Sequence, residues 1–391
     1  MEVCKYFGAC GGCAYLNIPY EEELAEKERA LRDVLGTTEH LLEGVIPAPA
    51  SKGYRNKMEL AFGDESKDGR LALGMRKRRS FYEVASLEEC QLIPDDFRKI
   101  ALYTQGFFRE TGEAFYHRKR HIGSLRHLVL RRGEFTGEIL INLSTTSSLQ
   151  SDLWQWVSGL KALELDGEMV GILHSVNDGV ADVVKDEDIR VLLGRDYFYE
   201  RICGLDFKVT ASSFFQTNSA GAEKLYGVVN DMAPSQNVAY DLYCGTGTIA
   251  QVLSPNFEKV IGVELNAAAI AAAKENAKLN GITNCEFYAG DVTAVLNEKT
   301  DFPIAEVTIV DPPRDGLHPK ALAKLIEIAP PNLIYVACKP ASLARDLVTL
   351  IAAGYEPIRA IGVDMFPRTP HVELVMFLRF SKKTKNILQT P

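Results

Sequence analysis

The chain has 391 residues, of which 46% are hydrophobic, and this is enough to build at least two cores. Its formal net charge of -8 argues against general attraction to nucleic acid or anionic membranes, so a polyanion has to meet a local basic surface. No apolar run reaches membrane-spanning length, and the N-terminus resembles neither a signal nor a transit peptide. We therefore expect a cytoplasmic protein with no membrane partner, whose eight cysteines are reduced thiols or metal ligands.

Four cysteines have the spacing of a metal site. Cys4, Cys10 and Cys13 form a C-x5-C-x2-C pattern among glycines that allow a tight loop, and Cys90 supplies a possible fourth ligand. Three local ligands and a remote one favour an iron-sulfur cluster. Structural zinc is the second choice and unligated core thiols are the third.

The next segments predict one helix and then a β-rich domain. Residues 20–35 carry apolar residues at helical spacing, which predicts an amphipathic helix. Between residues 53 and 191, short β-rich runs alternate with turns, which predicts a mostly antiparallel β domain. The runs 75–79 and 117–132 are rich in Arg and Lys and are either solvated faces or a surface for a polyanion.

Strands alternate with helices after residue 206, which predicts a parallel, doubly wound α/β sheet. We therefore expect domains at 1–205 and 206–382, with the helix at 20–35 free to pack on the second domain, and a loose basic tail at 383–391. Ligands of such sheets bind beyond the carboxyl ends of the strands. Several residues with functional potential fall there: Gly245, Gly247, Glu264, Asp291, Asp311 and Cys338.

The glycine loop leaves two classes of ligand open. The segment GTGTIA fits the G-x-G-x-x-A pattern, and Glu264 is placed to accept from ribose hydroxyls, as in nicotinamide-binding proteins. Asp241 before the loop, Asp291 after the third strand and the segment DPPRDG at 311–316 favour S-adenosylmethionine (SAM) instead. An ordinary strand-ending turn is the alternative explanation of the two prolines.

Several segments resemble one family closely. DLYCGTGT, GVEL, DPPRDGL, YVACKPASLARDL, DMFPRTPHVELV and SSFFQTN match, in order and spacing, the SAM-dependent RNA uracil-C5 methyltransferases. The resemblance implies a Rossmann-like class I SAM methyltransferase domain after a β domain that carries a [4Fe-4S] cluster on Cys4, Cys10, Cys13 and Cys90. It also implies the short form of the family, without an RNA-binding barrel before the first cysteine.

The resemblance also implies residue roles for the methyl donor. It carries SAM contacts over to Gln216, Tyr243, Glu264 and Asp311, with Asp291 and Thr248 as weaker additions. Either Phe214 or Phe215 is expected to stack on a base, and at least one of them to pack in the core. Cys203, Cys244 and Cys285 are expected to be ordinary small core residues.

A thiol at the end of a predicted strand has a chemical explanation. Carbon 5 of uracil is too weak a nucleophile to attack a sulfonium methyl group directly, whereas addition of a thiolate at C6 makes it an enolate. Cys338 is the predicted nucleophile, and Lys339 and Arg345 are nearby cations expected to lower the pKa of its thiol. The family usually has Ser and Asn where this chain has Ala337 and Lys339, so the local polar contacts differ.

An acid in an apolar strand is the predicted proton acceptor. In HVELVMFLRF, residues 371–380, Glu373 lies among apolar neighbours on both faces, and burial would raise its pKa and make it a better base. A frayed strand with a solvated Glu373 is the alternative. The family places its proton acceptor at the matching glutamate, and His371 is expected to have a supporting or structural role.

The expected function is methylation of a uridine at C5, in an RNA loop or in a base flipped out of a helix. The resemblance favours 23S ribosomal RNA, with a tRNA loop uridine as the alternative and a monomer as the expected state. A cytosine or amine methyltransferase and a non-catalytic iron-sulfur RNA-binding protein are the competing classes.

Overall fold

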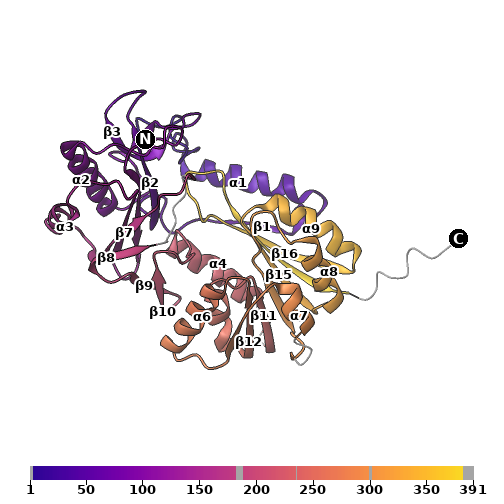
Figure 1. Ribbon diagram of the computed structural model, residues 1–391. Helices are drawn as coiled ribbons and strands as arrows, with labels where there is room; N and C mark the ends of the chain where they lie inside the picture. Colours follow the sequence, from indigo (N-terminus) through magenta and orange to yellow (C-terminus); the bar gives the residue numbers. More distant parts are fainter. Residues whose placement is uncertain (1–2, 182–187, 235, 299–301, 382–391) are drawn as a thin grey trace. The chain divides into compact units, whose positions relative to one another are not determined.

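The computed structural model describes residues 3–181, 188–234, 236–298 and 302–381, and it divides into two compact units (Figure 1). The first unit comprises Met1–Pro19, Ala50–Ile202 and Phe207–Ser219. The second comprises Tyr20–Pro49, Cys203–Asp206 and Ala220–Pro391. This division differs from the expected boundary at 205, because an N-terminal segment belongs to the second unit and the FFQTN segment to the first. The expected tail at 383–391 lies outside the described residues.

The first unit contains a seven-stranded sheet in the order β4-β3-β2-β5-β6-β7-β8. Its strands are β2 (Lys57–Asp64), β3 (Leu71–Arg76), β4 (Val84–Ser86), β5 (Leu125–Arg132), β6 (Glu138–Thr145), β7 (Glu168–Val176) and β8 (Ile189–Gly194). All neighbours pair antiparallel except β6 and β7, which the helix α3 (Leu153–Lys161) connects. The mostly antiparallel β domain is confirmed. A further pair, β9 (Tyr197–Ile202) and β10 (Leu205–Thr210), forms a two-stranded sheet.

Helix α2 (Asp95–Thr111) was not predicted, although the sequence carries its signals. Asp95 and Asp96 occupy the first turn, where carboxylates favour the positive end of the helix dipole, and Gly112 ends the helix in the left-handed conformation. Phe97, Ile100 and Phe108 recur at helical spacing and are buried in the core of this unit.

The predicted basic segment at 117–132 does not form one exposed surface. Arg118 and Arg120 are exposed, but Arg126 and Arg131 are buried and hold backbone carbonyls. Arg126 donates to the carbonyls of Gly179 and Ala181, and its guanidinium lies 3.9 Å from the centre of the Tyr116 ring. Because Arg126 and Arg131 lie in the buried strand β5, they hold backbone carbonyls inside the unit and are not part of an exposed basic surface.

The second unit contains an eight-stranded sheet in the order β1-β16-β17-β15-β14-β11-β12-β13. Its strands are β1 (Leu42–Ile46), β11 (Gln236–Leu242), β12 (Phe257–Glu264), β13 (Cys285–Ala289), β14 (Val307–Val310), β15 (Asn332–Ala337), β16 (Tyr355–Val363) and β17 (Glu373–Phe380). Strand β17 runs antiparallel to β15 and β16, and the other neighbours are parallel. The expected doubly wound sheet is confirmed, with β1 as an additional edge strand.

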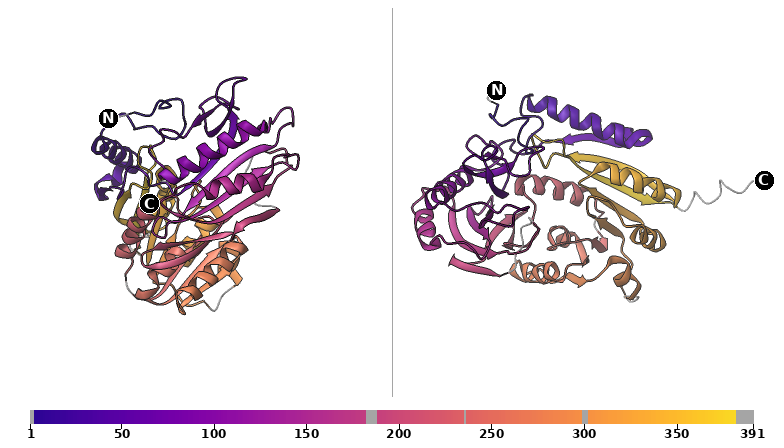
Figure 2. Two further views of the ribbon diagram at one scale, coloured as in Figure 1. Left: turned by 90° about the vertical axis from the view of Figure 1, so that its left-hand side faces the viewer. Right: turned by 45° about the horizontal axis from the view of Figure 1, so that its top comes forward.

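Helices flank this sheet (Figures 1 and 2): α1 (Tyr20–Leu35), α4 (Ser219–Met232), α5 (Thr248–Leu253), α6 (Ala267–Leu279), α7 (Val292–Glu298), α8 (Pro319–Ile328) and α9 (Pro340–Ala352). The predicted helix at 20–35 is confirmed as α1, which packs on α9 and β1. Short 3-10 turns lie at Gly36–Leu41 and Ser254–Asn256. In the part of the chain that the structure describes, none of the helices combines the length and the apolar character needed to cross a bilayer.

Candidate active site

The glycine loop after β11 has a backbone that few residues tolerate. Tyr243, Gly245 and Gly247 all have positive φ, of 68°, 52° and 74°. A side chain at Gly247 would come within 2.6 Å of the Phe287 ring, so both conformation and space require glycine there. The loop begins α5, and the Asp241 carboxylate accepts from Ala250 N at 2.9 Å.

Two further acids hold the backbone around this loop. Glu264, at the end of β12, accepts from Gly245 N at 3.3 Å and from Asn266 N at 2.9 Å. Asp291 accepts from the N–H groups of Thr293 and Ala294, at 3.0 and 3.1 Å, and so caps α7. Of the weaker candidates, Asp291 therefore has a structural role of its own, and Thr248 is buried at the start of α5.

Negative charge accumulates where the strand order reverses between β11 and β14. Burial raises the pKa of Asp241 to about 7, with a further contribution from Asp311. Asp311 is half-buried, and the partial burial of its carboxyl group raises its pKa to about 7. Asp241 Oδ1 is buried and has no hydrogen-bond partner among the described residues. Such a site favours a ligand with positive charge or with hydrogen-bond donors.

Cys338 follows β15 and is half-buried. Burial, then Glu373 and Asp311, raise the pKa of its thiol to about 11, whereas Arg314 lowers it. Lys339 and Arg345 are not among the largest influences on this pKa. Lys339 is exposed, and Arg345 donates to Asp346 and to the Asp315 carbonyl. Arg314 is the cation with the largest influence on the pKa of this thiol.

Glu373 begins β17 opposite Val363 of β16 and is 5% exposed. The predicted burial of this acid is confirmed. Burial, and secondarily Asp311, raise the pKa of Glu373 to about 8, while Arg314 lowers it. Cys338, Glu373 and Asp311 thus influence one another electrostatically within the second unit.

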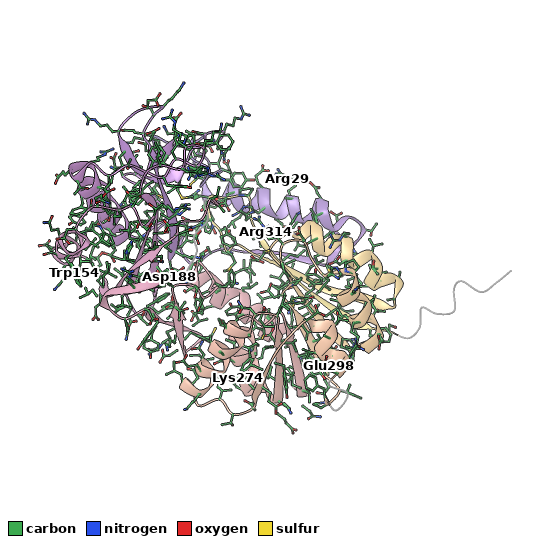
Figure 3. The ribbon with its side chains drawn as sticks, viewed as in Figure 1. Arg29, Trp154, Asp188, Lys274, Glu298 and Arg314 are labelled. Carbon is green, nitrogen blue, oxygen red and sulfur yellow. The ribbon has the colours of Figure 1, made fainter. Side chains whose placement is uncertain are left out.

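Arg314, which Figure 3 labels, was not predicted to have a role. Its loop is fixed by Asp346, whose Oδ2 accepts from Leu317 N at 2.9 Å and from the Tyr335 hydroxyl at 2.8 Å. A side chain at Gly316, where φ is 78°, would come within 2.7 Å of the same oxygen. Arg314 also lies 3.5 Å from His371 Nδ1. Its position within the DPPRDG segment was the available signal.

Gln216 belongs to the first unit. Its segment is anchored there by Arg131, which donates to the carbonyls of Thr210, Ala211 and Ser213. Phe215 is buried against Phe207, as expected for one of the two phenylalanines, and Phe214 is 74% exposed.

The four N-terminal cysteines line one pocket of the first unit. Backbone N–H groups lie near their sulfurs: Tyr6 N is 3.4 Å from Cys4 Sγ, and Gly12 N is 3.4 Å from Cys10 Sγ. Nevertheless, in the residues described, no group of three or more His, Cys, Asp or Glu is arranged to hold a metal ion. The donor set fits a thiolate-ligated metal group in kind, whereas the ligating arrangement is not formed.

The other cysteines differ in burial. Cys244 is buried, which agrees with the expected packing in the core, and Cys285 is half-buried. Cys203 is exposed, so its expected burial is wrong. It lies in a left-handed conformation with φ of 52°, at the turn after β9.

The sheet, its antiparallel β17, the glycine loop and the acid ending β12 define a SAM-dependent methyltransferase. Residues 137–381 match the family model described as tRNA (Uracil-5-)-methyltransferase. An uncharacterized RNA methyltransferase of Clostridium tetani is 44% identical over 383 residues, covering 96% of this chain and 83% of that protein. One of Clostridium acetobutylicum is 45% identical, with 96% and 83% covered.

A solved structure is also similar. That of Pyrococcus abyssi tRNA (uracil-54, C5)-methyltransferase in complex with S-adenosyl-L-homocysteine has a TM-score of 0.77 at 30% identity, covering 95% of this chain and 86% of that one. Because the family model matches more than half of the chain, this protein belongs to the tRNA (uracil-5-)-methyltransferase family and is an RNA methyltransferase.

Proposed function

We propose that the protein methylates C5 of a uridine in structured RNA, with SAM as the donor and a covalent Cys338 adduct on the pyrimidine. The observation that carries the proposal is the group formed by Cys338, Glu373 and Asp311 at one sheet edge, with Arg314 acting on both the thiol and the glutamate. Amine methylation needs neither the thiol nor the buried base.

The residues have distinct roles in this chemistry. Cys338 reacts as the thiolate, its proton having passed to water, and forms a bond from Sγ to C6, which leaves the ring as an enolate nucleophilic at C5. C5 would gain the methyl group as the bond between that methyl and the donor sulfur breaks, with S-adenosyl-L-homocysteine as the leaving group. Glu373 then takes the C5 proton, the C5–C6 double bond returns, and the Sγ–C6 bond breaks to release the thiolate. A high thiol pKa in the free protein means that ring binding near Arg314 has to promote proton loss.

The donor fits the acids of the glycine loop. SAM, when bound, supplies an electrophilic methyl group on a positively charged sulfur, and the Pyrococcus abyssi relative is solved with the corresponding demethylated product. Glu264 would accept from ribose hydroxyls, Tyr243 would line the pocket, and Asp311 would lie toward the target base. Gln216 is proposed as a further SAM contact, and Asp291 and Thr248 as weaker ones.

The RNA target has two candidates. A uridine of 23S ribosomal RNA is our first candidate and rests on the sequence resemblance. A T-loop uridine of tRNA is the second, and the likeness to the Pyrococcus abyssi enzyme over 95% of this chain favours it. In either case the exposed Arg118–Arg120 segment and Phe214 are proposed to contact phosphates and a base.

Incubating the protein with labelled SAM and total RNA from cells lacking it is expected to yield 5-methyluridine at one position. Nuclease digestion and mass spectrometry identify the nucleoside, and mapping identifies the RNA. Formation of 5-methylcytidine or a methylated amine would refute the proposed base. The absence of methyl transfer would instead support a non-catalytic RNA-binding protein.

We further propose that Cys4, Cys10, Cys13 and Cys90 hold a [4Fe-4S] cluster, with zinc as the second choice. The support is their shared pocket and the N–H groups near their sulfurs. Methyl transfer requires no redox step, so the proposed role is to shape the first unit or its RNA surface.

Protein purified without oxygen is expected to contain iron and sulfide in equal amounts, and Cys90→Ser should lower both. Cys203→Ser, at an exposed cysteine outside the pocket, is the matched control. Zinc without sulfide would favour the second choice. If iron removal changed neither thermal unfolding, RNA affinity nor turnover, the structural role would be wrong.

A further inference from the structure

Helix α1 buries two charged residues on its packed face. Glu23, Lys27, Leu31 and Leu35 recur every four residues and are its buried positions. Glu23 is 0% exposed and Lys27 is 1% exposed, and their side chains lie 2.7 Å apart. Leucines complete this face toward the helix C-terminus, so the two charges need an explanation other than amphipathic packing.

The partners of these charges lie in the segment between β16 and β17. Lys27 Nζ donates to Asp364 Oδ1 at 2.7 Å and to the Phe366 carbonyl at 3.2 Å. Glu23 Oε1 accepts from Arg368 N at 2.6 Å, where Arg368 has φ of 68°. Helix α1 therefore fixes both the beginning of this segment and its left-handed turn.

Asp364 is a junction of several elements. Its Oδ2 accepts from the Tyr20 hydroxyl at 2.8 Å, and that hydroxyl accepts from Ala48 N at 2.9 Å. Its Oδ1 also accepts from Phe366 N at 3.1 Å, and its own N–H donates to the Ile46 carbonyl of β1. Helix α1, strand β1 and the segment after β16 are thereby joined at one buried carboxylate.

This segment leads directly to the proposed base. Residues 364–372 connect β16 to β17, and the strand pair that closes the connection is Val363 with Glu373. The Phe366 carbonyl, which Lys27 contacts, also accepts from Thr369 Oγ1 at 2.7 Å. Thr369 Oγ1 accepts from His371 N at 3.3 Å, and His371 contacts Arg314. A continuous series of contacts therefore connects α1, through the segment 364–372, to His371 and Arg314.

The buried charges of Glu23, Lys27 and Asp364 are better explained by a role in fixing geometry than by a gain in stability. A buried ion pair gains little over well-packed apolar side chains, because removing two charges from water offsets most of their attraction. Such a cluster fixes geometry, because few other arrangements satisfy all of its members. Leucine at positions 23 and 27 would leave the segment 364–372 without these bonds.

We propose that Glu23, Lys27 and Asp364 are positioning residues that hold the β16–β17 connection, and through it Glu373, in the arrangement needed for proton removal at C5. This inference rests on the proposed function. Helix α1 is then a functional part of the catalytic unit, although its residues contact neither the ring nor the donor.

Lys27→Met is expected to lower turnover on RNA by about 10²-fold, since a misplacement of about 1 Å has that effect. KM for RNA should change little. The rate of covalent capture of 5-fluorouridine RNA, which requires no proton removal at C5, should stay within about twofold of wild type. Arg29→Met is the control, because Arg29 is exposed on the same helix (Figure 3). Its guanidinium lies 2.8 Å from the Glu26 carboxylate at the surface.

A second variant separates positioning from stability. Lys27→Met combined with Asp364→Asn removes one positive and one negative charge, so it avoids an unpaired buried ion. It should unfold nearer to the wild-type temperature than Lys27→Met and still turn over slowly. Wild-type turnover in the double variant, or equal losses of capture and turnover in Lys27→Met, would overturn the proposal.

Hydrogen exchange keeps this test independent of the proposed function. Peptides covering residues 364–372 should exchange faster in Lys27→Met, by about 10-fold or more, and unchanged in Arg29→Met. Unchanged exchange in Lys27→Met would refute the anchoring. If wild-type protein methylates no RNA, the proposed function fails, whereas the exchange result still decides whether α1 holds this segment.

Discussion

Cys338→Ala is expected to lower RNA methylation by at least about 10⁴-fold, because losing a covalent nucleophile removes the whole reaction route and not one contact. The alanine removes the only atom proposed to bond to the ring. SAM binding should be unchanged, since the donor is assigned to Tyr243, Glu264 and Asp311. Single-turnover transfer of labelled methyl groups and calorimetric SAM binding measure the two effects.

Target RNA containing 5-fluorouridine provides the complementary measurement for Cys338. A base removes a proton from C5 but cannot remove fluorine in the same way, so the cysteine cannot be eliminated. Wild-type protein with SAM should therefore form a stable conjugate through this cysteine. Cys203→Ala, at an exposed cysteine outside the site, should form it at the wild-type rate. A conjugate on another residue, or full methylation by Cys338→Ala, would contradict the covalent route.

Glu373→Gln is expected to lower turnover by about 10²- to 10⁴-fold, the usual contribution of a positioned base. The methylated adduct should accumulate on ordinary RNA, because its C5 proton then has no acceptor. Denaturing gels detect this adduct. Release of product at the wild-type rate would exclude Glu373 as the proton acceptor.

The pH dependence gives an independent check on the same residue. Since burial raises the pKa of Glu373 to about 8, its basic form increases as the pH rises through that value and levels off above it, and wild-type turnover should rise with it. Folded protein binds this proton more tightly than unfolded protein, so the residue's contribution to stability is full below about pH 4 and is lost toward pH 8. Glu373→Gln should therefore gain stability relative to wild type between pH 5 and pH 9, as measured by thermal unfolding.

The sequence predicted elements whose signals are local. Helix α1 was found at its observed bounds, and the strands of the doubly wound sheet followed from their apolar runs. The burial of Glu373 was also foreseen, because its neighbours in β17 are apolar on both faces. These features depend on period and composition, which a chain displays without its tertiary contacts.

Features that depend on distant partners were missed. The pattern of α1 suggested an apolar face, but Glu23 and Lys27 are buried because Asp364 and Arg368 reach them from the other end of the chain. Likewise, Lys339 is nearest to Cys338 in sequence, whereas Arg314 acts on the thiol through the fold. The separation of two residues along the chain therefore does not show how strongly their charges interact in the folded protein.

The position of strand β1 at the edge of the sheet affects when the second unit can fold during synthesis. Leu42 pairs with Ala360, so strand β1 remains without its hydrogen-bonding neighbour until strand β16, more than 300 residues later, has been synthesised. Contacts of such large sequence separation form late and slowly. Strands β16 and β17 complete both the proposed catalytic site and the edge of its sheet, so the site forms only after both strands have been made.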